Sequence, residues 1–425
     1  MIILFSAKVG EIMQSKKLTA IILLFCISVS IYACGANIDS LAYANKDDEK
    51  FEDILRKFSL NSAATIFTDS LNKNKNLCYS PASLYIAFAL ASAGAASQTQ
   101  SEMFGVLGLT GRDTKYISGQ IDMLLKKMYF KNRYGTIQIA NSVWLKESAE
   151  VKNEFLENAE NNYGSQVFNV NFNEIPATPL LMKNWVCENT DNLISPDFKY
   201  DPKLIFMYII NTLYFKDSWL DSFDERSTKI DLFHTADKQK VECEFMNKAI
   251  LYSKHPYFEG NGFTASSLEF YNGGKMTFIL PDENTDIYDL LSSPVTLDYV
   301  FDEANAKTGD VHFKVPKFKT QASFDLISAL KHLGVEKAFI FGSADFSGIT
   351  GEQIYISQVS QDTYIKIDEI GVEAAAMTQI MMRAGGGPDP DKRINIFLDR
   401  PFIYFITDKN GIILFEGVVF NPHEI

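Results

Sequence analysis

The amino-acid sequence predicts an α+β fold, with helices concentrated in the first part of the chain and strands in the later part. Apolar residues recur chiefly at helical spacing before residue 165, whereas strand-like segments separated by turns dominate from Val241 onward. The chain has 425 residues, 46% of them hydrophobic, and no proline- or serine-rich linker or repeat interrupts it. We therefore expect one domain with a large core over residues 51–425.

The expected helices follow from apolar spacing and from start and stop signals. Ser80 and Pro81 supply an N-cap and a first-turn proline for one helix, and Gly334 ends the last long one. The expected helices cover residues 51–72, 80–93, 116–130, 151–163 and 323–333.

The expected strands are rich in β-branched and aromatic residues. Turns at Asn272–Gly274 and Pro281–Asn284 separate several of them. The clearest strands cover residues 137–145, 206–215, 397–406 and 411–422. Helices followed by strands favour an α+β domain over a wound parallel sheet.

The N-terminal segment has the pattern of a secretory signal. Lys16 and Lys17 precede an apolar run over residues 18–32, and small residues follow it. The run is too short to cross a membrane comfortably, so an uncleaved anchor is the lesser alternative. We expect residues 1–36 to be a signal peptide, residues 37–50 to be a mobile polar segment, and the protein to be secreted and extracellular, without a membrane partner after cleavage. Met1 and Met13 are both candidate initiators.

The formal net charge of −13 argues against a general nucleic-acid binder. One dense basic cluster consists of Lys126, Lys127, Lys131 and Arg133. The cluster predicts either a solvated helix end or, as the alternative, a weak polyanion site.

The chain lacks the common motifs of catalytic and metal sites. It contains no Gly-x-Ser-x-Gly, His-Glu-x-x-His or Cys-x-x-Cys motif, and its five histidines have no ligand spacing. We therefore expect neither an enzyme nor a bound metal or cofactor. After signal removal, Cys78 is expected in the core, and a Cys187–Cys243 disulfide is left open.

The most informative segment is Ile367–Thr378, where small residues occupy a region that should hold large ones. Side chains alternate between the faces of a strand, so one face of this segment is small and buriable while the other can meet water. The buriable face consists of Val372, Ala374, Ala376 and Thr378. We interpret the segment as a strand that has not yet joined a sheet. Residues 381–393, rich in glycine, proline and charge, then predict an exposed loop.

This arrangement resembles the serpin family of serine protease inhibitors, from about Phe51 to Pro422. Seven further short motifs match the family in order and spacing: Asn76–Leu84, Asn211–Trp219, Phe278–Pro281, Val315–Phe318, Leu333–Gly334, Ala344–Ile349 and Gly417–Pro422. The resemblance implies a fold with about three β-sheets, eight to nine helices and an exposed reactive-centre loop at about residues 369–396.

The resemblance also implies a mechanism. In the family, a serine protease attacks the loop and forms an acyl-enzyme. The cleaved loop then inserts into the main sheet as a strand, and the attached protease is distorted before it can deacylate. The expected function is therefore suicide inhibition of a serine protease, of trypsin-like specificity. The alternative is a non-inhibitory serpin that acts as a carrier, chaperone or decoy binding module.

By this resemblance, the loop begins with a hinge. Glu369 matches the family's hinge glutamate, Lys317 matches its ion-pair partner, and Trp219 is expected beneath the point where the strand enters. Gly371 supplies backbone freedom, and Val372 is expected to be the first side chain buried. The hinge residues are Glu369, Gly371, Val372, Glu373, Ala374, Ala375 and Ala376.

Ser80, Ser83 and Asn211 match the polar cluster, or shutter, over which the family's sheet strands separate. The family usually has a histidine eight residues before the hinge glutamate, and Gln361 stands there in this chain. Because glutamine can donate and accept hydrogen bonds as a neutral imidazole does, opening of the sheet is expected to survive with altered stability. A purely structural role for these four residues is the alternative.

Two bonds are candidates for the scissile bond. The Arg383–Ala384 bond suits a trypsin-like protease, whose pocket has an acidic base. The family's usual spacing instead indicates the Gly385–Gly386 bond. The loop is longer than the family's usual length, so Lys392 and Arg393 are outside candidates.

Overall fold

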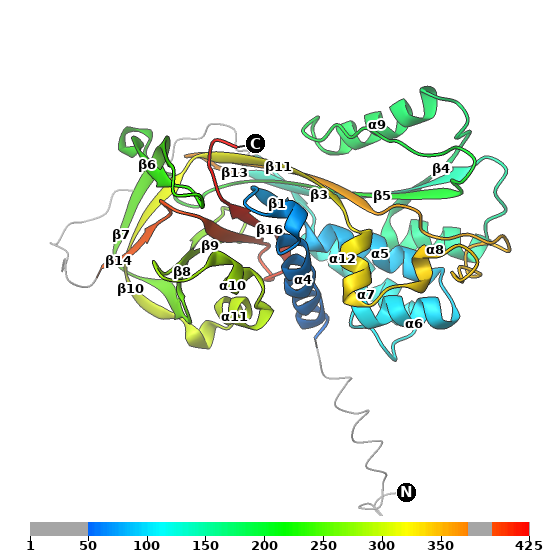
Figure 1. The fold of residues 1–425 in the computed structure, drawn as a ribbon, viewed down its shortest axis with the longest axis horizontal. Coiled ribbons are helices and arrows are strands. Elements are labelled where there is room, and N and C mark those ends of the chain that lie inside the picture. The colour runs from blue at the N-terminus through cyan, green and yellow to red at the C-terminus, as the bar shows by residue number, and fades with distance from the viewer. Residues whose placement is uncertain (1–49, 373–392, 425) are drawn as a thin grey trace, which may run out of the picture. The chain divides into compact units, whose positions relative to one another are not determined.

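The computed structural model describes residues 50–372 and 393–424 (Figure 1). The expected signal peptide, nearly all of the segment 37–50 and residues 373–392 of the expected loop lie outside the described residues. Within the described part, the α+β class expected from the sequence is confirmed.

Strands from distant parts of the chain form a seven-stranded sheet, called here the main sheet. In spatial order its strands are β11 (Phe318–Asp325), β12 (Ser360–Ile367), β13 (Gly371–Val372), β5 (Met207–Ser218), β3 (Gly135–Lys146) and β2 (Phe130–Lys131), with β4 (Ser165–Val170) also paired to β3. The strands β3 and β5 run antiparallel along most of their lengths and form the continuous part of the sheet.

The remaining described strands form a second, nine-stranded sheet. Its order is β1 (Leu77–Tyr79), β16 (Ile413–Val419), β15 (Phe402–Thr407), β9 (Lys275–Pro281), β8 (Phe263–Glu269), β7 (Lys240–Gly260), β10 (Lys307–Pro316) and β14 (Arg393–Phe397), with β6 (Lys229–His234) paired to β7. The first part of β7 pairs with β6 and its last part with β8, so this one long strand joins two groups of strands. Hydrogen bonding therefore unites two of the three sheets that the resemblance implied.

The described residues contain nine α-helices, within the expected range of eight to nine. They are α4 (Phe51–Phe67), α5 (Pro81–Ala93), α6 (Ser97–Val106), α7 (Thr114–Met128), α8 (Asn153–Tyr163), α9 (Ala177–Asn189), α10 (Ile287–Leu291), α11 (Pro294–Asp298) and α12 (Ile327–Leu333). The Ser80 side chain accepts the Ser83 amide and caps α5, as expected. In Figure 1, α9 covers one face of the main sheet, and α5 lies on the other.

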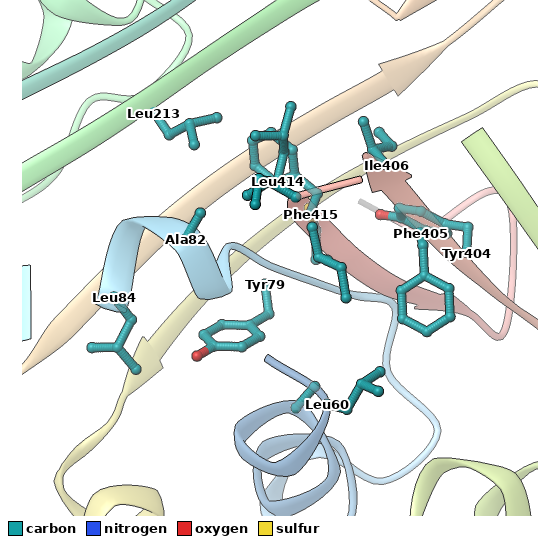
Figure 2. Packing of buried hydrophobic residues seen from close by; sticks show 14 of the residues in the cluster. Leu60, Tyr79, Ala82, Leu84, Leu213, Tyr404, Phe405, Ile406, Leu414 and Phe415 are labelled. Carbon is teal, nitrogen blue, oxygen red and sulfur yellow. The ribbon is translucent and has the colours of Figure 1, made fainter. Parts of the chain in front are cut away.

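The core lies between the two sheets and α4 and α5. Figure 2 shows labelled side chains from β5, β15, β16, α5 and α4 gathered there. The rings of Phe318 in β11 and Tyr404 in β15 are 5.6 Å apart and connect the sheets directly. Since each large apolar side chain that is fully buried stabilises a fold by about 1.5–3 kcal/mol, this interface contributes strongly to stability.

Two helix expectations need correction, and some helices were missed. The helix expected over residues 323–333 begins only at Ile327, because alternate residues of 318–325 are buried and this segment forms β11. The expected helix 51–72 ends at Phe67. The helices α6, α9, α10 and α11 were not expected; α9 exposes Leu180 and Leu181, which blurs its apolar stripe.

Candidate functional site: the hinge and the opening in the main sheet

The hinge begins inside the main sheet. In β13, Val372 pairs with Ile367 of β12 on one side and with Asp217 of β5 on the other. The Val372 side chain is fully buried. A Cβ atom at Gly371 would lie 2.2 Å from the Asp217 carbonyl oxygen, so no other residue fits this close approach. Three residues of the segment Ile367–Thr378, which was interpreted as a strand outside any sheet, therefore already belong to the main sheet: Ile367 in β12, and Gly371 and Val372 in β13.

A tight turn over residues 368–370 connects β12 to β13. The Asp368 carboxylate accepts the Ile370 and Gly371 amides at 3.0 and 3.3 Å. Trp219, the residue that follows β5, holds the turn in place: its indole Nε1 donates to the Asp368 carbonyl at 3.0 Å, and its amide donates to the Ile370 carbonyl at 2.8 Å. The expected position of Trp219, at the point where the strand enters, agrees with this geometry.

Glu369 is almost fully buried in this turn. Its carboxylate lies 3.4 Å from the Lys317 ammonium and accepts the Thr228 hydroxyl at 2.8 Å. Lys317 also pairs with Glu244 at 3.3 Å. Burial alone would raise the pKa of Glu369, but its backbone hydrogen bond, Thr228 and the charge of Lys317 together lower it. The expected Glu369–Lys317 pair is therefore present, and Thr228 is a partner that sequence reasoning missed.

Asp217 is a buried acid that the sequence analysis did not single out. Its carboxylate accepts the Asn272 side-chain amide at 2.9 Å, and no described residue forms an ion pair with it. Burial raises the pKa of Asp217 to about 7, against the lowering effect of hydrogen bonds from Asn272 and Ser218. The available signal was an acid between two aromatic residues, Phe215, where the expected strand ended, and Trp219.

The four expected shutter residues form two pairs below β13. The Gln361 carboxamide joins the Ser80 backbone twice: Oε1 accepts the Ser80 amide at 2.8 Å, and Nε2 donates to the Ser80 carbonyl at 2.9 Å. On the side of β5, the Ser83 hydroxyl donates to the Asn211 side chain. Asn211 in turn donates to Asn141 of β3, which sequence reasoning missed.

A cavity of about 180 Å³ opens between β5 and β12 below β13. No strand pairing joins β5 to β12 directly in the described residues, so β13 is their only link within the sheet. The cavity is lined by both strands, by α5 and by all four shutter residues. At its other end, the Tyr208 hydroxyl reaches Gln358 at 2.9 Å. A gap in the sheet, bounded by two strands and closed at each end, can accept one more strand.

Two of the four basic cluster residues are neutralised by acids. Lys126 pairs with Asp122 at 2.7 Å, and Lys127 pairs with Glu52 at 3.1 Å. These pairs favour the solvated helix end over a polyanion site at Lys126, Lys127, Lys131 and Arg133, and the polyanion site stays a prediction.

The described cysteines are unpaired. Cys78 is fully buried in β1, as expected. Cys187 in α9 and Cys243 in β7 are both free, so the disulfide left open by the sequence does not form. The described residues contain no His, Cys, Asp or Glu cluster that could hold a metal ion. None of their helices is long and apolar enough to cross a membrane.

Several expected site residues lie outside the described part of the chain. These are the hinge residues Glu373, Ala374, Ala375 and Ala376 and the scissile-bond candidates Arg383, Ala384, Gly385 and Gly386. Their assignments stay predictions.

Comparison with known proteins identifies the family of this chain. The family model for Serpin (serine protease inhibitor) matches residues 54–422. Serpin A3-1 of Bos taurus is 32% identical over 362 residues, which cover 83% of this chain and 85% of that protein. The chain belongs to the serpin family.

Solved structures agree with this assignment. The native state of tengpin, a thermophilic serpin, superposes with a TM-score of 0.79 at 28% identity, covering 88% of this chain and 95% of tengpin. Thyroxine-binding globulin in complex with thyroxine superposes with a TM-score of 0.75 at 25% identity, covering 88% of this chain and all of that one. The expected serpin fold is therefore confirmed, and the similar proteins include both a thermophilic serpin and a thyroxine-binding globulin.

Proposed function

We propose that this chain is a secreted inhibitor of a trypsin-like serine protease that acts as a suicide substrate by inserting its cleaved loop into the main sheet. The observation that carries the proposal is the seating of β13 between β5 and β12 directly above an open cavity. In this proposal, β13 is the first part of the inserted strand, and the cavity below it provides space for the residues that follow.

The register of β13 supports this proposal. Val372 lies opposite Asp217 and Ile367. Continuing this antiparallel register by four residues would bring Ala376 between Leu213 and Thr363, both buried. A larger side chain would have little room there, which gives a physical reason for the small residue.

The same register brings the loop to the shutter. Six residues beyond Val372, Thr378 would stand between Asn211 and Gln361, the two polar side chains on opposite sides of the gap. A hydroxyl can donate to one amide and accept from the other. The polar residue on the otherwise small, apolar face therefore matches the polar part of the cavity.

The length of β5 favours a scissile bond near Arg383. In the continued register, Met207 at the start of β5 would face Met382, so Arg383 is the first residue beyond the strand. A protease acylated there would be pulled against the far end of the sheet. A protease at Lys392 would keep a tether nine residues longer than one at Arg383, up to about 30 Å, and would not be distorted by insertion. Gly385 lies only two residues further on, so the length of β5 is also compatible with the alternative scissile bond, Gly385–Gly386.

The test compares two matched charge substitutions. Ala376→Asp places a charge on the face that must be buried, whereas Ala375→Asp places the same charge on the opposite, solvent-facing side. We expect wild-type protein and Ala375→Asp to form an SDS-resistant complex with trypsin, and Ala376→Asp to be cleaved as a substrate. Mass spectrometry of the released peptide should show Ala384 as its first residue. Equal trapping by both variants would contradict the register, and absence of any wild-type complex would contradict the inhibitor function.

A carrier function is the second candidate. The similar protein solved with thyroxine binds this small molecule, as its name, thyroxine-binding globulin, says, and the apolar and polar lining of the cavity between β5 and β12 fits a small amphipathic ligand. Stabilisation of the intact protein by such a ligand, with no trypsin complex, would favour this candidate.

A further inference from the structure

The Asp217 carboxyl is enclosed between the hinge and the neighbouring strand of the main sheet. Asp217 lies opposite Val372 of β13 on one side and opposite Gly135 of β3 on the other. Residues directly opposite each other in a sheet direct their side chains to the same face, with Cβ atoms about 4.5–5.5 Å apart. The buried Val372 side chain therefore covers the carboxyl on one side. Gly135 leaves it room on the other, because a Cβ atom there would lie 3.0 Å from Asp217 Oδ1.

Two asparagines fix the hydrogen bonding of this carboxyl. The Asn132 side chain donates to the Asn272 side-chain oxygen at 2.6 Å, and the Asn272 amide donates to Asp217 at 2.9 Å. Because the Asn272 oxygen is already engaged, this side chain presents a donor to Asp217 in either protonation state. Hydrogen bonds from Asn272 and Ser218 do not replace all the water that a carboxylate loses on burial, so burial raises the pKa of Asp217 to about 7.

The other charged and titratable groups around Asp217 have other partners or point elsewhere. They come from the hinge turn, the turn before β3, the turn after β8 and β5 itself, and are Asp368, Glu369, Arg133, Tyr134, Tyr271 and Lys216. Glu369 and Asp368 each pair with a lysine at 3.4 Å. Arg133 lies over the Tyr134 ring, and the residue before Asp217 points to the opposite face of β5. Among the described residues, none compensates the charge of an ionised Asp217.

Release of β13 from the sheet would expose this carboxyl to water. Once Val372 has left, the pKa of Asp217 falls toward about 4, the value of an exposed aspartate. Because the pKa is higher with β13 in the sheet than with β13 released, protonation favours the seated strand. This advantage is complete below pH 4, is lost as the pH rises through 7, and changes no further above that value.

We propose that Asp217 is a positioning residue for the reactive loop, which keeps β13 in the sheet while its carboxyl is protonated and releases β13 when the carboxyl ionises. Release frees residues 368–372, so the chain that connects β12 with the scissile bond becomes five residues longer. The longer connection lets the scissile bond reach further into a protease cleft, and inhibition is faster at pH 8 than at pH 6. This effect on inhibition rests on the proposed inhibitory function, whereas the movement of β13 does not.

Hydrogen exchange at the amides of Gly371 and Val372 in the intact full-length protein measures the release. Dividing each exchange rate by the intrinsic rate at the same pH gives the fraction of molecules with β13 released. Between pH 5 and pH 8 we expect this fraction to rise about ten- to a hundredfold in wild type, the range allowed by a pKa change of up to about three units. In Asp217→Asn it should stay within about twofold, because an amide does not titrate. Asp362→Asn in β12, the matched control, should keep the wild-type pH profile.

The rate of association with trypsin tests the consequence for inhibition. Trypsin has a pH dependence of its own, so the wild-type rate is divided by the Asp217→Asn rate at each pH. We expect this ratio to rise up to about tenfold between pH 6 and pH 8.

Exchange at Val372 that is independent of pH in wild type, or that changes equally in wild type and Asp217→Asn, would overturn the control of β13 by Asp217. A constant rate ratio beside changing exchange would overturn its role in inhibition. If wild type forms no trypsin complex at any pH, the proposed inhibitory function is refuted, and hydrogen exchange still decides whether Asp217 controls β13.

Discussion

Gln361 shows how one side chain can hold the shutter without titrating. Its carboxamide makes two hydrogen bonds to the Ser80 backbone. The Ser80 hydroxyl in turn donates a hydrogen bond to the Leu414 carbonyl at 2.8 Å. An imidazole at this place would exchange donor and acceptor roles as its protonation changed, whereas an amide keeps both near neutral pH.

We therefore expect Gln361→Ala to lower the free energy of unfolding by about 1–3 kcal/mol, because the Ser80 amide and carbonyl would stay buried without partners. Denaturant unfolding of the intact protein measures this change, and Gln98→Ala, at an exposed position in α6, is the control. The loss should be the same at pH 5 and pH 8. A loss as small as that of Gln98→Ala would show that the Ser80 contacts are dispensable.

Unlike Gln361, Asp217 is expected to make the stability of the protein depend on pH. The pKa of its carboxyl is raised to about 7 by burial, while in the unfolded chain it is about 4. The native state therefore holds its proton more tightly, so the stability from this group is complete below pH 4 and is lost as pH rises through 7.

Asp217→Asn removes the titrating proton while keeping the side-chain shape. We expect the variant to melt at a higher temperature than wild type at pH 8 and to differ little from it at pH 4. Thermal unfolding at both values, with Asp362→Asn as the control, provides the measurement. If Asp217→Asn shows the same difference in melting temperature between pH 4 and pH 8 as wild type, the pH dependence comes from other groups.

At the scale of elements, sequence patterns correctly predicted helices whose position depends on local apolar spacing and on capping residues. The helix α5 has its serine cap and first-turn proline, and α8 ends at Tyr163 as expected. The start of α12 was misplaced because residues 318–325 alternate in burial against the second sheet, a tertiary effect. The family resemblance gave Glu369 and Lys317 as a pair, whereas Asp217 and Thr228 meet the hinge only through the fold.

From the sequence we expected a strand that starts to be buried at Val372, but outside any sheet. Sequence reasoning did not place Gly371 and Val372 between β5 and β12 in the intact protein, because only the folded chain shows the gap between these strands. Gly371 lies so close to the Asp217 carbonyl that β13 can pair with β5 in this position only without a side chain at residue 371.

Gly371→Ala should therefore expel β13 from the sheet, since its Cβ would meet backbone that cannot move aside. We expect faster hydrogen exchange at the amides of Gly371 and Val372 and a lower melting temperature. Gly351→Ala is the control, because a Cβ atom there meets nothing within 4 Å. Unchanged exchange in Gly371→Ala would mean that the hinge tolerates a side chain and is not clamped by β5.

At the scale of the whole molecule, the proposed mechanism requires that the intact fold is not the most stable one. The main sheet has a gap between β5 and β12. In the described residues, only the two-residue strand β13 pairs with both of these strands. A sheet with an unfilled position can gain many backbone hydrogen bonds and apolar contacts when a strand enters. The intact state is then held by a kinetic barrier.

Thermal unfolding of intact and loop-cleaved protein tests this claim most directly. The account predicts that cleavage near Arg383, with both fragments retained, raises the melting temperature by tens of degrees, on the order of many stabilising substitutions at once. The Ala376→Asp variant should lose most of this increase. Equal melting temperatures for intact and cleaved wild-type protein would contradict strand insertion and, with it, the proposed mechanism.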